Sequence, residues 1–256
     1  CPLCVPHARG GRVTPRDAAS MPANPAMRAA AAAAVELIQD GERVGLGSGR
    51  TASVFVRLLG ERVRGGLRVT AVPASGAIEV LARAEGIPLM ALSADEGLDI
   101  TVDGADEVAP NLDMIKGHGG ALVRERIIAS ASKRQVILVG AEKLVRELGE
   151  RFAVPVEVIP FALGPVIRAI RGAGLVPNVR MDAACAHELV NENGNLTVDC
   201  ALPAPLVDAR AARELEATLL AIAGVVDTGL FLGTAERVFV GHAEGRVSVL
   251  VRGQPA

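Results

Sequence analysis

The segment Arg43-Val44-Gly45-Leu46-Gly47-Ser48-Gly49-Arg50-Thr51 comes directly before a mostly apolar run, Ala52 to Leu59. Arg43 to Leu46 is typical of a short strand, residues 45–51 form a glycine-rich loop, and the apolar spacing that follows predicts a helix. These are the parts of a βα unit whose backbone N–H groups bind phosphate at a helix N-terminus. The loop lacks the Gly-Lys-Ser/Thr of a P-loop and the glycine spacing of a dinucleotide fingerprint. By itself it therefore indicates either an anion-binding loop or a tight strand–helix turn.

Helical and strand patterns alternate on both sides of this unit up to about residue 150. Gln135 to Val139 is very apolar, as expected of a strand buried in a parallel sheet. The alternation predicts a doubly wound α/β domain. We predict helices over 27–39, 77–85 and 121–132, strands over 67–73, 98–102 and 135–139, and a further apolar run at 89–92.

The pattern changes near residue 150, where Pro155, Pro160 and Pro165 punctuate the chain and Asn193-Gly194 predicts a hairpin. Two helices among antiparallel strands indicate a small α+β domain. We predict helices over 162–171 and 209–221, strands over 179–183, 187–190, 196–200 and 225–231, and a terminal strand pair over 237–240 and 246–251. The expected organisation is a disordered extension over 1–20, an α/β domain over 21–149 and 232–256, and the small domain over 150–231.

Composition excludes several classes of partner. The chain has 256 residues, 50% of them hydrophobic, with a net charge of -2, 2% aromatic residues and no Trp or Tyr. Such a chain has neither the bulk charge nor the stacking platforms of a nucleic-acid-binding protein. No apolar run is long enough for a membrane span. Cys1 and Cys4 form a C-x-x-C beside His7, but no second pair follows at zinc spacing, so we predict no metal site. The low cysteine count favours a cytoplasmic location.

Two further motifs carry candidate chemistry. Residues 103–107, D-G-A-D-E, end a predicted strand, and ligands of open α/β sheets bind beyond the carboxyl ends of strands. Its carboxylates suit hydroxyl binding, proton transfer or a metal, although a solvated turn with a helix cap is the alternative. Residues 116–120, K-G-H-G-G, offer backbone amides and a positive charge, and Glu125 follows early in the next helix. Glu125 could equally belong to an ordinary Arg-Glu-Arg triplet on the protein surface. His118 is interpreted mainly as a tolerated substitution in a glycine loop.

These motifs resemble those of type A ribose-5-phosphate isomerases. The resemblance rests on D-G-A-D-E-V from Asp103, M-I-K-G-x-G-G-A-L-x-R-E-R-I from Met114 and L-V-G-A-E-K-L-V from Leu138, and it extends over residues 27–251. It implies interconversion of ribose 5-phosphate and ribulose 5-phosphate in the pentose phosphate pathway, without metal or organic cofactor. It also implies a Rossmann-like, doubly wound, mostly parallel sheet domain, a smaller α+β (ferredoxin-like) domain and a homo-oligomer, either a dimer or a tetramer.

The resemblance also assigns roles to residues. Glu125 would be the proton acceptor, and Asp103, Asp106 and Lys116 would be catalytic with it. A base that moves a proton between adjacent carbons and fixed donors that stabilise an enediolate suit this reaction. The expected substrate contacts are Ser48, Gly49, Arg50, Thr51, Asp103, Gly104, Ala105, Asp106, Lys116, Gly117, His118, Gly119 and Lys143.

Departures from the family pattern and competing functions remain open. Arg50 replaces the usual Ser of the glycine loop, His118 replaces a Gly, and Met27 and Arg28 lie where the family often has a Lys. Arg50 could bind phosphate and compensate for that lost charge. A sugar-phosphate-sensing domain without turnover is the main alternative, but a sensor needs no base such as Glu125. The D-G-A-D-E and K-G-x-G-G motifs together argue against an amino-sugar-phosphate deaminase or a CoA transferase.

Overall fold

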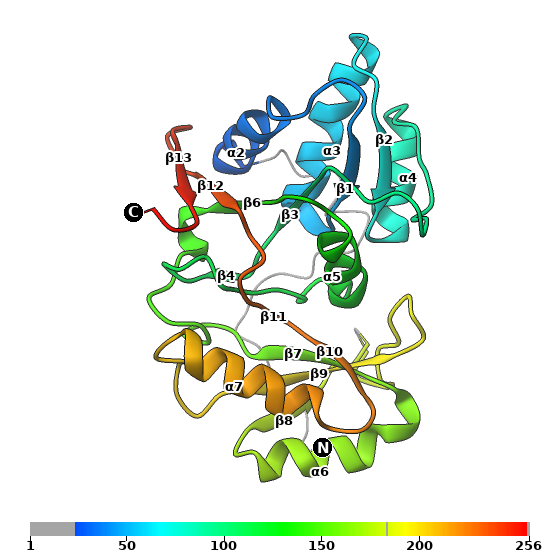
Figure 1. Ribbon diagram of the computed structural model, residues 1–256. Coiled ribbons are helices and arrows are strands. Elements are labelled where there is room, and N and C mark those ends of the chain that lie inside the picture. Colours follow the sequence, from blue (N-terminus) through cyan, green and yellow to red (C-terminus); the bar gives the residue numbers. More distant parts are fainter. Residues whose placement is uncertain (1–23, 183, 255–256) are drawn as a thin grey trace.

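A six-stranded sheet is the centre of the larger unit of the molecule (Figure 1). The computed structural model describes residues 24–182 and 184–254, so the predicted extension 1–20, with Cys1, Cys4 and His7, lies outside the described residues. The strand order is β13-β12-β6-β3-β1-β2, and only β12 and β13 pair antiparallel. The strands are β1 (Arg43–Leu46), β2 (Thr70–Pro73), β3 (Ile100–Gly104), β6 (Gln135–Gly140), β12 (Arg237–Gly241) and β13 (Val247–Val251).

Alternate side chains of β6 enter two different cores, as the period-two geometry of a strand requires. Val136 and Leu138 pack in a core with residues of the helices α2 (Pro25–Val35) and α3 (Gly49–Arg64). Ile137 and Val139 pack in a second core with residues of a three-stranded sheet. β6 is therefore buried on both faces, which explains its uninterrupted apolar sequence.

The three-stranded sheet was not predicted from the sequence. It consists of β4 (Glu107–Val108), β5 (Met114–Ile115) and β11 (Leu230–Phe231), in the order β11-β5-β4. Each strand has two residues, too few to show a periodic pattern. This sheet leads the chain from β3 to α5 (Leu122–Ser130), while α4 (Gly76–Ala84) follows β2.

The smaller unit has β-α-β-β-α-β connectivity, which confirms the expected ferredoxin-like fold. All its strand pairs are antiparallel, in the order β10-β7-β9-β8. β12 and β13 follow this unit in sequence but lie in the first sheet, and the domain boundaries at residues 150 and 232 stay a prediction. The elements are β7 (Val154–Val158), α6 (Leu163–Gly172), β8 (Val176–Val179), β9 (Leu196–Ala201), α7 (Ala209–Leu220) and β10 (Val225–Thr228).

Several predicted strands were wrong in their bounds. The strand predicted at 179–183 is β8, which ends at Val179, and it tolerates Pro177 because β8 is an edge strand. The runs 89–92 and 187–190 form only isolated bridges. The strand predicted at 225–231 divides at Gly229, whose N–H donates to Pro155 O (2.6 Å) and whose C=O accepts from Lys116 N–H (2.9 Å). At Gly229 the chain passes from the smaller unit to the larger one.

Helix and remaining strand bounds were close to the predictions. The first helix ends at Val35 rather than residue 39, and α3 begins three residues earlier than expected, at Gly49. In the part of the chain that the structure describes, no helix combines the length and apolar character that a membrane span requires.

Candidate active site

The glycine loop lies at the carboxyl end of β1, and its last three residues already belong to α3. Gly49, Arg50 and Thr51 form the first turn of this helix. Ser48 precedes the helix in an extended conformation, and its N–H donates to Asp103 Oδ1 (3.1 Å). The first N–H groups of a helix have no partner within it. This turn therefore presents donors to an anion.

Gly47 is required by the close approach of Asp103. A Cβ atom at position 47 would lie 2.0 Å from Asp103 Oδ1, so a side chain there would displace the carboxylate. The N–H of Gly47 donates to Val102 O (2.9 Å), which ties the loop to β3. Gly49 has a φ of +88°, which favours glycine. The glycines thus allow the loop to pack closely onto β3, and they also leave its backbone N–H groups accessible to an anion.

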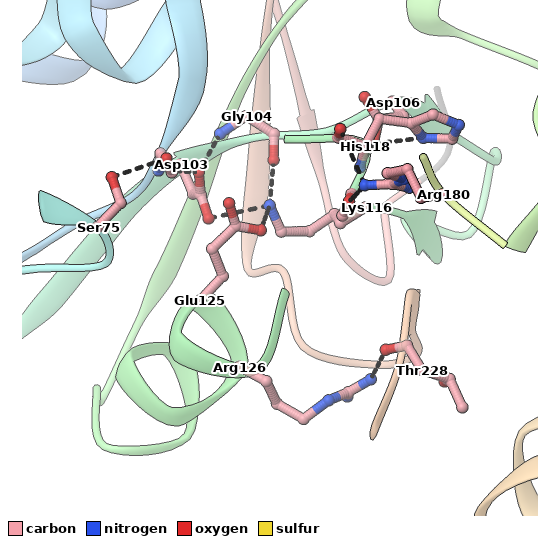
Figure 2. A network of polar contacts seen from close by, with 12 residues as sticks. Ser75, Asp103, Gly104, Asp106, Lys116, His118, Glu125, Arg126, Arg180 and Thr228 are labelled. Atoms are coloured by element: carbon pink, nitrogen blue, oxygen red, sulfur yellow. Dashed lines mark hydrogen bonds and ion pairs between the residues drawn. The ribbon is translucent and has the colours of Figure 1, made fainter. Parts of the chain in front are cut away.

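Three charged side chains meet in the interior of the site (Figure 2). Asp103 lies near the end of β3, Lys116 follows β5, and Glu125 lies in the first turn of α5. Lys116 Nζ is 2.9 Å from Asp103 Oδ2 and 2.9 Å from Glu125 Oε2, and it donates to Gly104 O at 2.6 Å. The side chains of Lys116, Asp103 and Glu125 are 3%, 3% and 6% exposed. One ammonium group therefore balances two buried carboxyl groups.

Burial and neighbouring charges set the protonation of this cluster. Burial, joined by the negative charge of Asp103, raises the pKa of Glu125 to about 7, although Lys116 opposes the shift. Burial alone would lower the pKa of Lys116, but Asp103 and Glu125 outweigh it and raise that pKa above its ordinary value. Lys116 therefore stays charged near neutrality, whereas Glu125 can gain or lose a proton there.

Asp106 and His118 form a second group beside this cluster. Asp106 Oδ2 accepts a hydrogen bond from the His118 N–H (3.1 Å) and lies 3.0 Å from His118 Nδ1. The imidazole packs against Phe152, with ring centroids 4.7 Å apart, and Lys143 Nζ lies 4.9 Å from the Phe152 centroid. Burial would raise the pKa of Asp106, but His118 and Lys116 outweigh it and lower that pKa. Asp106 is therefore a carboxylate at neutral pH.

Most of the predicted site residues come from turns at the carboxyl ends of strands. Lys116 forms ion pairs with both Asp103 and Glu125, and the N–H of Ser48 donates a hydrogen bond to Asp103. Arg50 is exposed, and its side chain makes no hydrogen bond or ion pair with the described residues. Gly104 and Ala105 lie at and after the end of β3, Gly117 and Gly119 lie in the loop before α5, and Lys143 ends a short helical turn after β6.

Several residues that support the site were not singled out from the sequence. Ser75 Oγ lies 3.0 Å from Ser48 Oγ, and an Arg180 guanidinium N–H donates to Gly117 O (3.1 Å) and His118 O (3.2 Å). Ser75 follows β2 at the same sheet edge, so the strand-end rule could have found it. Arg180 comes from the smaller unit, and no local signal pointed to it.

Among residues 24–182 and 184–254, no three His, Cys, Asp or Glu side chains are grouped so that they could hold a metal ion.

Comparison with known proteins identifies the family of this chain. The family model described as ribose 5-phosphate isomerase A (phosphoriboisomerase A) matches residues 70–245. The ribose-5-phosphate isomerase A of Methylorubrum extorquens is 45% identical over 228 residues, which cover 87% of this chain and 94% of the relative. The protein of the same name from Gloeobacter violaceus is 47% identical over 222 residues, covering 86% and 94% of the two chains.

The chain belongs to the ribose-5-phosphate isomerase A family. Solved structures of such isomerases share its fold. A D-ribose-5-phosphate isomerase in complex with phospho-erythronic acid has a TM-score of 0.85 and 35% identity, covering 91% of this chain and all of that one. Ribose 5-phosphate isomerase A of Methanocaldococcus jannaschii has a TM-score of 0.82 and 38% identity, with 90% and 100% covered. These likenesses confirm the predicted Rossmann-like and ferredoxin-like architecture.

The structure of this isomerase A family member predicts that Lys116 is essential to stability. Lys116→Met leaves two buried carboxyl groups without their cation, and we expect a loss of about 3–5 kcal/mol in the free energy of unfolding. Urea denaturation at neutral pH measures this loss. The matched control is Lys133→Met, because Lys133 is 72% exposed and pairs with Asp99 at 2.8 Å. That variant should lose about 0–1 kcal/mol, and equal losses in the two variants would contradict the assignment.

Proposed function

We propose that this protein interconverts D-ribose 5-phosphate and D-ribulose 5-phosphate. The observation that carries the proposal is the buried carboxyl group of Glu125, with a pKa raised to about 7, held 2.9 Å from the ammonium group of Lys116. Membership of the isomerase A family supports the same reaction. The substrate class is supported by the relative that was solved with phospho-erythronic acid, a phosphorylated sugar acid.

Glu125 is the proposed base. In the ionised form it removes the proton from C2 of the open-chain aldose and returns it to C1. The proton of the C2 hydroxyl passes to the C1 oxygen, so that the carbonyl moves from C1 to C2. A base is most effective when its pKa lies near the working pH, and burial places Glu125 there. The intermediate is an enediolate, whose developing negative oxygen lies next to the ammonium group of Lys116 and is stabilised by it.

The two aspartates have different proposed tasks. Asp103 accepts from Ser48 N–H, Gly104 N–H and Lys116 Nζ and is 2% exposed, so it holds Lys116 and the glycine loop in place. Asp106 has a side chain that is 22% exposed, with contacts to His118 through Oδ2. Asp106 is therefore better placed to exchange a proton with the anomeric hydroxyl during ring opening.

The remaining expected contacts bind the substrate and are proposed for that role. The first turn of α3 supplies backbone N–H groups, and the exposed guanidinium of Arg50 can add a bidentate phosphate contact. Remote binding of the phosphate orients the carbons that react. The homo-oligomer is a proposal drawn from the resemblance, and the cytoplasmic location is one drawn from the low cysteine count. A sensing role without turnover is less well supported, because it gives no reason to bury a base beside a cation.

Replacement of the base tests the reaction directly. Glu125→Gln keeps the size of the side chain but cannot accept a proton, so kcat for ribose 5-phosphate should fall by about 10²–10⁴-fold. A coupled assay for ribulose 5-phosphate, run with and without EDTA, measures it. The wild-type rate should not change with EDTA. Full activity in Glu125→Gln would contradict the role of the base, and a loss of wild-type activity in EDTA would contradict the metal-free reaction.

The raised pKa of Glu125 predicts the acid side of the pH profile. The base must be ionised, so kcat should fall as the pH drops below about 7 and should decline tenfold per pH unit well below it. An ordinary glutamate would keep the rate constant down to about pH 5. Rates at saturating substrate from about pH 3.5 to about pH 9 measure this limb. A midpoint near pH 4.5 would mean that Glu125 is solvated in the working enzyme.

Arg50 gives a test of phosphate binding. Arg50→Ser restores the residue usual in the family and removes a charge-assisted contact, so KM for ribose 5-phosphate should rise more than about tenfold with kcat little changed. Arg57→Ser is the matched control on the same helix, because Arg57 is half-exposed and, within residues 24–182 and 184–254, forms an ion pair only with Glu85. An unchanged KM in Arg50→Ser would place the guanidinium in solvent.

A further inference from the structure

The turn at Asn191–Asn195 is a rigid projection of the smaller unit. The N–H groups of Asn193 and Asn195 both donate to Asn191 Oδ1 (3.0 Å), and the N–H of Gly194 donates to Asn191 O (3.0 Å). The side-chain amides of Asn193 and Asn195 donate to Oε1 of Glu157, a fully buried residue of β7, at 3.0 and 2.8 Å. The turn therefore moves with the sheet of the smaller unit rather than as a loose loop.

The tip of this turn contacts two helices of the larger unit. Both carboxylate oxygens of Glu192 accept from the N–H of Gly76, the first residue of α4, at 3.1 and 2.9 Å. Arg124 of α5 donates from one terminal nitrogen to Glu192 Oε2 (2.7 Å) and from Nε to Asn193 Oδ1 (2.9 Å). In Figure 1 the turn, drawn in yellow, projects from the lower sheet on the side of α5. One carboxylate thus joins α4, α5 and the smaller unit.

Of the helices contacted by Glu192, α5 carries the proposed base, and α4 begins directly after a residue that contacts the glycine loop. Arg124 is the residue next to Glu125 in the first turn of α5. Gly76 follows Ser75, whose Oγ lies 3.0 Å from Ser48 Oγ at the start of α3. The contacts of Glu192 therefore lie next to both the proposed base and a neighbour of the proposed phosphate loop. Glu192 itself belongs to neither.

On its other side, α5 is held by a less exposed contact, in which the side chains of Arg126 and Asp227 are 23% and 12% exposed. Arg126 donates to Thr228 O and Leu230 O, both at 2.8 Å, and pairs with Asp227 at 2.5 Å. Figure 2 shows Arg126 pointing from α5 toward Thr228, away from Lys116. The Arg124–Glu192 pair has side chains that are 40% and 48% exposed. Exposed ion pairs are weak, so α5 has a firm attachment at Arg126 and a releasable one at Arg124.

The reacting groups are buried, so the contact at Arg124 must open before a substrate can reach them. A substrate carbon must come within about 3–3.5 Å of the base, yet the side chain of Glu125 is 6% exposed and that of Lys116 is 3% exposed. We propose that Glu192 and Arg124 are positioning residues that form a latch between the two units, which holds Glu125 in its buried position during proton transfer and opens to admit the sugar phosphate. This proposal rests on the proposed function and adds a residue pair to it.

The latch is tested with Glu192→Gln, Arg124→Gln and the double variant. Each single change breaks the same ion pair, so each should lower kcat/KM for ribose 5-phosphate about tenfold, since small displacements of a reacting group have effects of this size. The double variant should be no more than about twofold worse than the poorer single variant, because coupled residues are not additive. Arg124→Lys, which keeps the charge, should recover part of the loss.

The pH profile of Arg124→Gln separates a latch from a purely structural contact. Asp103, Lys116 and Asp106 still face Glu125 in this variant. Loss of a nearby positive charge would by itself raise the pKa of Glu125, whereas opening would hydrate the carboxyl group and lower that pKa from about 7. We expect the acid limb of kcat to move to lower pH. A limb that stays in place or moves to higher pH would overturn the proposal.

Glu79→Gln is the matched control. Glu79 lies in the first turn of α4 and forms a 2.8 Å ion pair with Arg83 of the same helix, so its loss removes an exposed pair without parting the two units. This variant should keep the wild-type kcat/KM and pH profile. Additive effects of the two latch variants, or equal effects in Glu79→Gln, would also overturn the proposal.

Amide hydrogen exchange tests the latch independently of the isomerase reaction. In Glu192→Gln the backbone amides of residues 122–126 and 191–195 should exchange faster than in the wild type, while those of β6 should not change. If the wild type isomerises no ribose 5-phosphate, the proposed function fails, and this exchange still tests the latch. If the wild type is active and exchange is unaltered in Glu192→Gln, the latch alone fails.

Discussion

The ammonium group of Lys116 is the interaction on which the site depends. It lies 2.9 Å from a carboxylate oxygen of Asp103 and 2.9 Å from one of Glu125, and all three side chains are buried. Two carboxyl groups cannot both stay ionised in such surroundings without a cation. Asp103 in turn accepts from the N–H of Ser48 and occupies the space that a side chain at Gly47 would need. A single charge therefore connects the end of β3, the glycine loop and the first turn of α5.

The smaller unit is part of this arrangement rather than a separate attachment. The chain returns to the larger unit through Gly229, whose C=O accepts from the N–H of Lys116. The next strand brings the ring of Phe231 under two cations, with Lys116 Nζ 5.2 Å and Arg126 Cζ 4.2 Å from its centroid. Phe231 is fully buried. The strand that carries Phe231 thus follows directly on the last strand of the smaller unit, which links the position of Lys116 to that unit through Gly229.

The secondary structure could be predicted where local patterns and tertiary demands agree. β6, which is buried on both faces, shows a continuous apolar run, and it was predicted at its place. The turn around Asn193-Gly194 was also predicted at its place, because this residue pair is typical of a turn. The strand at β8 was predicted too far along the chain, because Pro177 is acceptable only on an edge strand. Whether a strand lies at an edge is a property of the whole sheet. The division at Gly229 was missed because its cause is a hydrogen bond to Lys116, more than a hundred residues away.

The sequence by itself determined which chemical groups were candidates. The strand-end rule brought Asp103 forward, the glycine-rich motif brought Lys116 forward, and its place early in the next helix brought Glu125 forward. The three-dimensional fold decided what those groups can do. The pKa of Glu125 is raised to about 7 by burial and by charges that come from other elements, and the partner of Arg124 is Glu192, 68 residues further along the chain. Local patterns report neighbours within a few residues, whereas burial and electrostatic fields are set by every group within a few ångströms. Protonation and positioning could therefore be assigned only after the chain was folded.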